Sequence, residues 1–369
     1  MYLTNIDHAD VFDLQLGTFV APIQPAGGPP PNAGWRGLSL TPDGSQRVIA
    51  DFGAQSVYLL NPDTGAGGAT FVGGISGVAN SGPSRVAATS TQTVFVSIRA
   101  EGGSNSGCAS CLSQMNLSAT PPTVQPAPEP EVSSLLGAPL LQGNAGGDNV
   151  VFAFGNNSGG RITTWNSGSP DQFNVSGTNA AVSDIASTAD GTMFAVQSNG
   201  AAEIHDSSMF ATGVPASAEL TQVPGRIAVP GLAMHPTGAL LYQPFLTGPA
   251  GVANVKGGVD ITDARSGALR MRIILPQQFM TDVDTLHGGF LTIDENGQRL
   301  FAITTLDGTP QKASLTVVQL AAVPLAIGSL SASTVPVAGG APITIRGADF
   351  KRGSKSPSAA NRRPQILWI

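Results

Sequence analysis

The chain has 369 residues, of which 46 are glycine and 28 are proline, and only 11% are charged. This composition supplies many turns and little material for long amphipathic helices, so it favours an all-β chain. The formal net charge of −6 argues against a nucleic-acid partner, because phosphate binding needs clustered Lys and Arg. No apolar run reaches the ~20 residues of a membrane span, and the first residues lack the pattern of a signal peptide.

The N-terminal segment predicts a sheet without its innermost strand. Residues 1–5, 11–14 and 18–21 are three runs of strand length. They match the second, third and fourth strands of the more complete repeat that follows. We therefore expect the encoded chain to begin within a sheet, and the Pro-rich residues 22–36 to connect that sheet to the next one.

Residues 37–65 predict three short antiparallel strands joined by tight turns. Apolar runs around Leu38, Ile49 and Leu59 are bounded by the turns Pro42–Gly44 and Asn61–Gly65. In both turns proline presets φ and glycine accepts a positive φ, so each turn fixes the register of a hairpin.

Weaker copies of this pattern recur along the chain. Its first strand and turn are repeated in 184–191, 231–238 and 290–297, and more divergent copies occur in 85–98 and 147–154. Repeats of roughly 40–50 residues, each built from a few strands, are typical of the blades of a β-propeller. We therefore predict an all-β fold, a β-propeller of about six to seven four-stranded blades in which the first blade is incomplete.

Three segments of the chain, Tyr2–Asn5, Leu40–Gly44 and Asn61–Gly65, resemble the YVTN-type β-propeller repeat of secreted and surface proteins of bacteria and archaea. The resemblance covers residues 1–323 and is strongest in the first quarter of the chain. It implies an exported propeller that is extracellular, at the cell surface or periplasmic. It also implies a binding or structural role toward a protein or glycan, and we expect a monomer without a cofactor.

The only two cysteines, Cys108 and Cys111, lie in a loop rich in Gly and Ser. A zinc site would need further ligands, and no second cysteine pair or nearby His is present in the sequence. A dithiol redox motif would be expected at the start of a helix in an α/β protein, and nothing in this sequence suggests such a setting. In an exported protein we expect the two cysteines to form a short disulfide.

The next loop, the Pro-rich residues 121–130, is expected to be an exposed linker.

The residues just before each innermost strand of a propeller surround one mouth of its central channel, where polar groups could converge. Aligning the repeats gives four candidates for this mouth, Arg36, Arg85, Asp184 and His287. Asp282 and Asp284 are close to His287 in sequence, and a His with two carboxylates could ligate a divalent ion or share a proton. The alternative is that these are solvated loop residues beside a turn.

After residue 323 the sequence changes character. Residues 327–331 and 337–350 resemble the opening strands of an IPT/TIG domain, an immunoglobulin-like sandwich of surface and adhesion proteins. The resemblance covers residues 324–350, whereas a complete sandwich needs about 100 residues. The basic segment that follows lacks strand alternation. We therefore expect a fragment of an immunoglobulin-like sandwich, followed in 351–369 by a disordered or aberrant tail.

Two classes of function are consistent with these features. The leading one is a non-catalytic exported or cell-surface β-propeller that acts as a protein- or glycan-binding or structural module, because loops can vary on a rigid frame. The alternative is a propeller enzyme, a lactonase-like hydrolase or a lyase, with its site at the mouth of the central channel. The sequence contains neither a nucleophile elbow nor a phosphate-binding loop, so nucleophilic and nucleotide chemistry are not supported.

Overall fold

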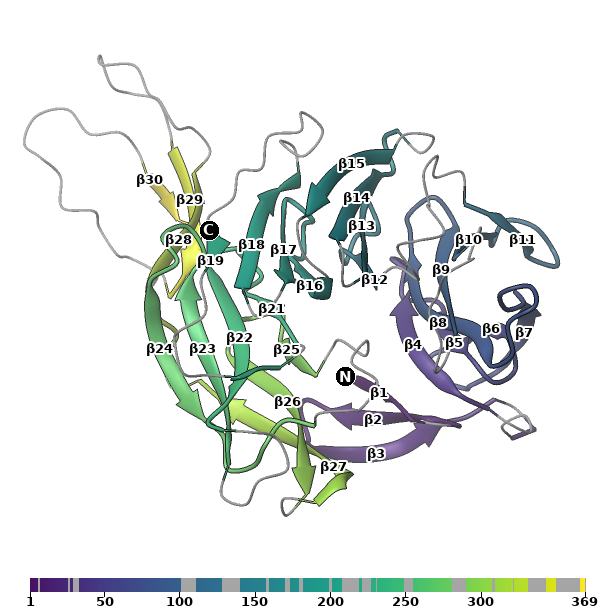
Figure 1. Cartoon of the computed structure of the whole chain (residues 1–369), viewed down its shortest axis with the longest axis horizontal. Coiled ribbons are helices and arrows are strands. Elements are labelled where there is room, and N and C mark those ends of the chain that lie inside the picture. The colour runs from purple at the N-terminus through teal and green to yellow at the C-terminus, as the bar shows by residue number, and fades with distance from the viewer. Residues whose placement is uncertain are drawn as a thin grey trace, which may run out of the picture. The chain divides into compact units, whose positions relative to one another are not determined.

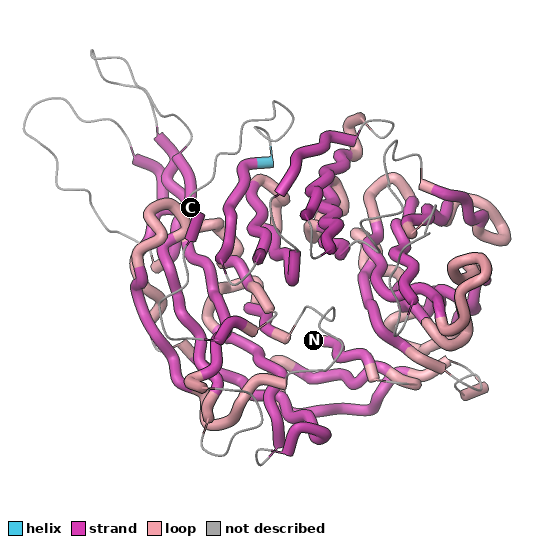
Figure 2. The backbone as a smooth tube through the Cα atoms, in the orientation of Figure 1, coloured by secondary structure: helices cyan, strands magenta, loops and turns pink. Residues whose placement is uncertain are grey.

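The computed structural model describes residues 1–5, 7–25, 27–28, 33–100, 111–127, 140–156, 159–169, 173–178, 182–198, 201–207, 219–220, 227–229, 231–248, 255–280, 290–306, 309–320, 322–330, 343–349 and 366–368. Within these ranges the regular structure is β-strand, except at the helical residue Ser207 (Figure 2). The prediction of an all-β chain is therefore confirmed. No helix in the described ranges is long and apolar enough to cross a membrane. The chain forms two compact units, Met1–Val182 and Ser183–Ile369.

The first unit contains four antiparallel sheets in which each strand pairs with the next strand along the chain (Figure 1). The sheets are β1 (Tyr2–Thr4), β2 (Ala9–Asp13) and β3 (Thr18–Ile23); β4 (Trp35–Leu40), β5 (Arg47–Asp51), β6 (Ser56–Leu60) and β7 (Gly67–Phe71); β8 (Ser81–Ala88), β9 (Thr93–Ala100), β10 (Leu112–Asn116) and β11 (Thr123–Pro126); and β12 (Leu140–Gly143), β13 (Asn149–Asn156), β14 (Gly159–Asn166) and β15 (Phe173–Thr178). The three strands predicted near the N-terminus and the three predicted in 37–65 are all present.

The turn between β4 and β5 shows how the sequence sets each hairpin. Thr41 Oγ1 donates a hydrogen bond to Asp43 Oδ1 (2.6 Å), and the backbone N–H of Ser45 donates to the same oxygen (3.0 Å). Gly44 has a φ of +69°, in the left-handed region that costs other residues about 1–2 kcal/mol. The polar side chains thus close the turn, and Gly44 avoids the backbone strain that another residue would have at this positive φ.

Consecutive sheets of the first unit pack face to face through apolar side chains. One cluster joins the β1–β3 sheet to the β4–β7 sheet and contains Ala9, Trp35, Ile49, Tyr58 and Leu60. On the other face of the β4–β7 sheet, a second cluster joins it to β8–β11 and contains Val48, Ala50, Val57, Val86, Val94, Val96 and Met115. All five residues of β5 are buried because both faces of its sheet are covered.

A polar contact also holds the first sheet against the second. Arg47 is only 3% exposed, and its Nη2 donates a hydrogen bond to the hydroxyl of Tyr2 (2.8 Å). The guanidinium carbon lies 4.1 Å from the centroid of the Tyr2 ring, so a cation–π contact accompanies the hydrogen bond.

Two outermost strands of the first unit contain proline. Pro22 lies in β3 and Pro126 in β11, each at the edge of its sheet. The expectation that 121–130 forms only an exposed loop is wrong for Thr123–Pro126, which form β11. An edge strand tolerates proline because one row of its N–H groups has no partner strand.

The second unit begins with three antiparallel sheets of the same kind (Figure 1). They are β16 (Val182–Ser187), β17 (Met193–Ser198), β18 (Ala201–Asp206) and β19 (Glu219–Leu220); β20 (Ile227–Ala228), β21 (Ala233–Met234), β22 (Leu240–Leu246), β23 (Gly257–Asp263) and β24 (Leu269–Ile274); and β25 (Leu291–Ile293), β26 (Arg299–Leu306) and β27 (Thr309–Gln319). The short strands β20 and β21 both pair with β22.

The chain ends in a mixed sheet of β28 (Ala326–Leu330), β29 (Ile343–Ala348) and β30 (Ile366–Trp368), in which β29 and β30 are parallel. This C-terminal sheet shares a hydrophobic core with the sheets before it, because Ala326 and Ala348 belong to the same buried cluster as Leu240 and Leu320. The remainder of the predicted tail, 351–365 and 369, lies outside the described residues.

Candidate binding site

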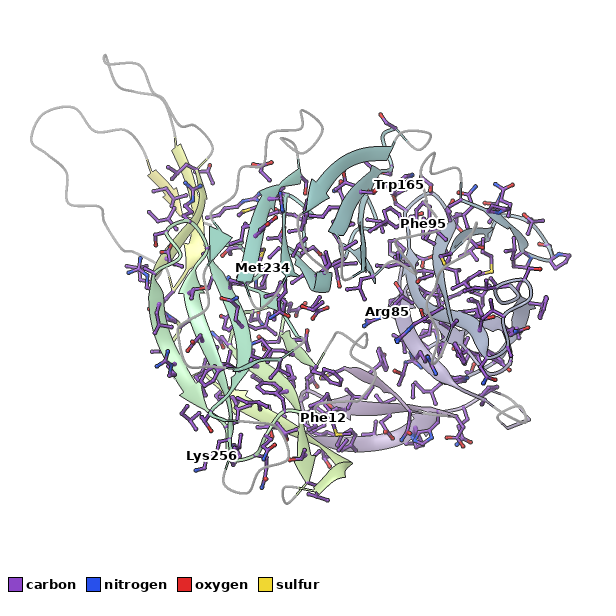
Figure 3. All side chains as sticks on the ribbon, viewed as in Figure 1. Phe12, Arg85, Phe95, Trp165, Met234 and Lys256 are labelled. Atoms are coloured by element: carbon purple, nitrogen blue, oxygen red, sulfur yellow. The ribbon has the colours of Figure 1, made fainter. Side chains whose placement is uncertain are left out.

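Two of the residues predicted at the channel mouth come from strands that touch. β4 and β8 are edge strands of neighbouring sheets. At Gly37 the two backbones are so close that an added Cβ would lie 2.7 Å from the carbonyl oxygen of Ser84 and 2.8 Å from the Cα of Arg85. Arg36 precedes Gly37, so Arg36 and Arg85 are carried on strands in direct contact. Both side chains are half-buried, and Figure 3 labels Arg85 on β8.

An aromatic ring supports Arg36. Its guanidinium carbon lies 3.7 Å from the centroid of the Phe52 ring, a distance typical of a cation–π contact. Asp51, next to Phe52, is fully buried, and its Oδ1 accepts hydrogen bonds from the N–H groups of Gly34 and Ala54, each at 2.9 Å. These bonds fix the turn that carries Phe52. Arg36 is therefore positioned by a rigid local frame.

The predicted positions of these residues relative to the strands were wrong. Arg36, Arg85 and Asp184 lie within β4, β8 and β16, whereas the alignment placed them before an innermost strand. The register is irregular between Trp35 and Gly37, so Arg36 occupies a β-bulge. A bulge adds one residue to a strand, so an alignment of the repeats that does not include it misplaces the residues beside it.

The remaining mouth candidates cannot be placed together with these arginines. Asp184 is buried in β16 of the second unit. His287 and the two weak metal candidates, Asp282 and Asp284, lie outside the described residues. The prediction that they converge stays a prediction.

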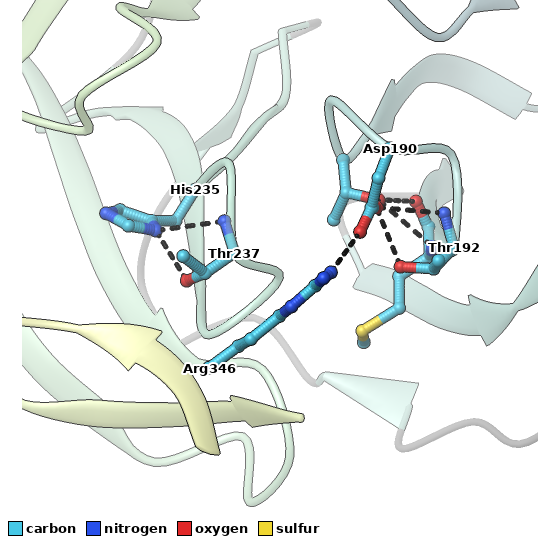
Figure 4. Close-up of polar contacts among 7 residues, drawn as sticks. Asp190, Thr192, His235, Thr237 and Arg346 are labelled. Carbon is cyan, nitrogen blue, oxygen red and sulfur yellow. Dashed lines mark hydrogen bonds and ion pairs between the residues drawn. The ribbon is translucent and has the colours of Figure 1, made fainter. Parts of the chain in front are cut away.

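In the second unit, polar groups gather at the turns that follow β16 and β21 (Figure 4). Asp190 Oδ1 accepts hydrogen bonds from the hydroxyl groups of Thr188 and Thr192, both at 2.8 Å. Its other oxygen accepts from Arg346 Nη1 at 2.9 Å. Burial alone would raise the pKa of Asp190, but these hydrogen bonds and the Arg346 charge outweigh it and hold the pKa below its usual value.

His235 occupies the equivalent turn after β21. It is 5% exposed, and its Nδ1 accepts a hydrogen bond from the N–H of Thr237 (3.3 Å) and lies 2.8 Å from the Thr237 hydroxyl. Burial lowers the pKa of His235 to about 4, against the opposing charge of Asp294. The imidazole is therefore neutral near pH 7, and its place is a structural one in the turn.

His8 has the opposite environment. Its Nδ1 lies 2.6 Å from a carboxylate oxygen of Asp7, and its Nε2 lies 3.2 Å from one of Asp10. The hydrogen bond with Asp7 is the main reason that the pKa of His8 is raised. Because the two carboxylates contact different ring nitrogens, the three side chains do not converge on one point. The part of the chain that the structure describes holds no group of three or more His, Cys, Asp or Glu side chains that could bind a metal ion.

Cys111 is fully buried at the start of β10 and is disulfide-bonded. Cys108, the other cysteine of the sequence, lies outside the described residues.

Sequence reasoning missed the contacts that Asp190 and Arg346 make with each other. Asp190 could have been identified from its turn, because Thr188–Thr192 repeats the order of polar groups in Thr41–Ser45. No local signal identifies Arg346 as its partner, since the two residues are far apart in sequence and in different sheets.

Two solved structures are similar to most of this chain. Hydrazine synthase of Kuenenia stuttgartiensis matches it with a TM-score of 0.58 and 14% sequence identity, over 87% of this chain and 92% of that chain. The β-propeller domain of Cps50 (Swd1) of Myceliophteria thermophila matches with a TM-score of 0.57 and 10% identity, over 85% of this chain and 91% of that chain. No family model and no curated protein matches the sequence.

At these identities the likeness establishes the fold alone. The predicted fold class is confirmed: the chain is an all-β protein with a β-propeller fold. The number of blades and the YVTN and IPT/TIG resemblances stay predictions.

Proposed function

We propose that the chain is a non-catalytic, exported β-propeller that binds a protein or a glycan bearing carboxylate groups. The observation that carries this proposal is that two half-buried arginines, Arg36 and Arg85, lie on touching edge strands. Guanidinium groups bind carboxylates in planar, bidentate geometry, and an aromatic ring beneath one of them keeps it oriented.

The other polar groups described here have a structural role in turns and not a catalytic one. Asp43, Asp190 and Asp294 accept hydrogen bonds from groups of their own turns, which hold the pKa of each carboxyl low. A carboxylate used in this way is neither a general acid nor a base near neutral pH. The turns are thus suited to a rigid propeller whose faces present binding groups.

The disulfide of Cys111 supports export. Disulfides persist in oxidising compartments and are rare in reducing ones. Fractionation of the native source would test this part of the proposal, and recovery of the chain in the cytosol with reduced cysteines would contradict it.

Binding should be tested with defined acidic and neutral ligands. We expect the purified chain to bind a uronic-acid polysaccharide or a Glu-rich peptide in calorimetric titrations, and to bind a neutral dextran much more weakly. Arg36→Met and Arg85→Met should each weaken binding about tenfold or more, because each removes a charge-assisted hydrogen bond. Arg270→Met is a matched control, since Arg270 lies in a different sheet from Arg36 and Arg85, is 43% exposed, and pairs with Asp263 of its own sheet. Equal binding by all three variants would contradict the proposal.

The enzymatic alternative has its own test. A metal-dependent site at the channel mouth would stabilise the fold in the presence of its ion by mass action. The thermal midpoint with Ca²⁺, Mg²⁺, Mn²⁺ and Zn²⁺ measures this directly. A shift that Asp282→Asn and His287→Gln both abolish would favour the hydrolase or lyase over the binding module.

A further inference from the structure

A side chain that closes a turn recurs before the outermost strand of five sheets. In each case an Asp or Asn at the end of the preceding strand, or directly after it, accepts a hydrogen bond from the backbone N–H two residues later. The acceptors and distances are Asp13 (2.7 Å), Asn61 (2.9 Å), Asn116 (2.8 Å), Asn166 (2.8 Å) and Asp263 (3.1 Å). The shared geometry means that these residues stabilise the turn in the same way, whichever of the two residue types is present.

Only one of these turns combines asparagine with a hydroxyl residue two positions later. Asn116 is followed by Leu117 and Ser118, whereas Pro62 follows Asn61 and Gly168 completes the turn of Asn166. Asn-x-Ser, with x not proline, is the acceptor sequence for N-linked glycans. The turn after β10 thus carries a chemical feature that the equivalent turns lack.

Asn116 lies exposed in a turn whose backbone is anchored. Asn116 and Ser118 are exposed, and Leu117 between them is partly buried and packs against the core. The N–H of Leu117 also donates to the carbonyl of Gln92 at 2.8 Å. The backbone of the turn is therefore anchored while Asn116 Oδ1 is held by the Ser118 N–H. The residue that carries the amide nitrogen Nδ2 is exposed.

Another occurrence of the motif provides an internal contrast. Asn174–Ser176 has the same pattern, but it lies inside β15, where Asn174 and Ser176 are in register with Thr164 and Ile162 of β14. A strand in a ladder cannot bend into a transferase site without breaking backbone hydrogen bonds. The third occurrence, 156–158, extends beyond the described residues.

We propose that Asn116, in its folded turn, is an acceptor for an N-linked glycan at an exporting membrane. In the transfer, Asn116 Nδ2 forms a bond to the anomeric carbon of a lipid-diphosphate-linked oligosaccharide. The bond from that carbon to the diphosphate oxygen breaks, the lipid diphosphate leaves, and the amide loses one proton. The enzyme and the lipid-linked donor come from the exporting membrane. This proposal rests on the export included in the proposed function.

The first experiment uses the chain isolated from its native source. Treatment with peptide N-glycosidase in H₂¹⁸O should convert Asn116 to an ¹⁸O-labelled aspartate, and the intact mass should fall by the mass of the glycan. An unlabelled Asn116 peptide from an exported, disulfide-bonded chain would overturn the proposal.

A second arm separates this proposal from the question of export. The full chain, with a cleavable signal sequence added, is secreted by a eukaryotic host that glycosylates Asn-x-Ser sites. Asn116→Asp and Ser118→Ala should both abolish the glycan at this site, and Ser118→Thr should retain it. Asn116→Asp keeps the turn-closing oxygen, as in Asp13 and Asp263, so an unchanged thermal midpoint shows that the variant folds.

Asn174→Gln is the control and should leave the glycan occupancy of Asn116 unchanged. An unmodified Asn116 in the secreted chain would overturn the proposal wherever the native protein is found. Occupancy there, together with a cytosolic native chain, would instead contradict the proposed export and leave the acceptor assignment supported.

Discussion

Gly297 and His235 show how one residue can be fixed by another in a different sheet. Gly297 closes the turn between β25 and β26 with a φ of +69°, and a Cβ at this position would overlap Nε2 of the His235 imidazole. His235 in turn lies buried in the turn after β21. Gly297 is therefore required both by its backbone conformation and by the ring that lies against it.

We expect Gly297→Ala to destabilise the second unit more than its backbone strain alone would. Gly44→Ala is a matched control, because Gly44 has the same φ of +69° and nothing within 4 Å of its added Cβ. The control should lose about 1–2 kcal/mol, the cost of a left-handed alanine, and Gly297→Ala should lose at least 1 kcal/mol more. Urea unfolding of both variants measures the difference. Equal losses of unfolding free energy would show that the His235 ring moves away from the added methyl group without destabilising the fold.

His235 should make stability depend on pH. Its pKa is about 4 in the folded chain and about 6.5 when unfolded, so the unfolded chain binds the proton more readily. The stabilising effect is complete above pH ~6.5 and is lost as the pH falls toward 4, by about 3 kcal/mol in all. Unfolding free energies near pH 7 and near pH 5, for the native chain and His235→Asn, check this. His8 acts in the opposite direction, because its pKa is raised in the folded chain and it therefore adds stability as the pH falls. The difference between the native chain and His235→Asn isolates the contribution of His235.

At the scale of the element, the C-terminal sheet is held to the second unit by both apolar and polar contacts. Ala326 and Ala348 lie in the shared core, and a Cβ on Gly328 would overlap the carbonyl oxygen of Thr237. Arg265 Nε donates to the carbonyl of Gly328 at 2.9 Å. The ion pair of Arg346 with Asp190 lies at the exposed margin, with side chains 51% and 40% exposed.

The apolar contacts should dominate this docking. Exposed ion pairs contribute about 0–1 kcal/mol, so Arg346→Ala should change the unfolding free energy by less than ~1 kcal/mol. Ala348→Asp buries an unpaired carboxylate at a position that is 1% exposed and should cost about 3 kcal/mol or more. Limited proteolysis and urea unfolding of the two variants compare them. A larger effect from Arg346→Ala would mean that charge, and not packing, attaches the sheet.

The sequence allowed most of these elements to be predicted, for identifiable reasons. Asn61–Gly65 and Pro42–Gly44 are turns whose residues leave few backbone alternatives, so the strands on either side followed. The strand Thr123–Pro126 was missed because proline disfavours a strand unless the strand is at an edge, and edge position is a property of the assembled sheet. Arg36 was misplaced for a similar reason, since its bulge arises from pairing with β5.

At the scale of the whole molecule, stability comes from sheets that cover one another's faces. Phe95 illustrates this, because its ring meets Phe152 of the next sheet edge-on at 5.0 Å and Trp165 at 5.3 Å. All three side chains are at least 98% buried. Patterns of alternation in sequence indicate which residues face inward, but they do not say which sheet covers them. Only the three-dimensional structure shows which sheet covers each buried side chain.

Phe95→Ala should therefore cost about 3–5 kcal/mol, the usual effect of removing a large buried ring between packed layers. Phe71→Ala is the control: Phe71 is 68% exposed in the outermost strand β7, and its loss should change stability by less than ~0.5 kcal/mol. Chemical denaturation followed by tryptophan fluorescence reports both. Similar losses for the two variants would contradict face-to-face packing as the main source of stability.

The prolines of β3 and β11 have a consequence for behaviour at high concentration. A protein made of many short sheets exposes many strand borders, and each could recruit a strand from a neighbouring molecule. Pro22 and Pro126 each remove a donor from such a border and interrupt the ladder that a foreign strand would need. We therefore expect these two borders to resist the addition of a strand from another molecule at high concentration.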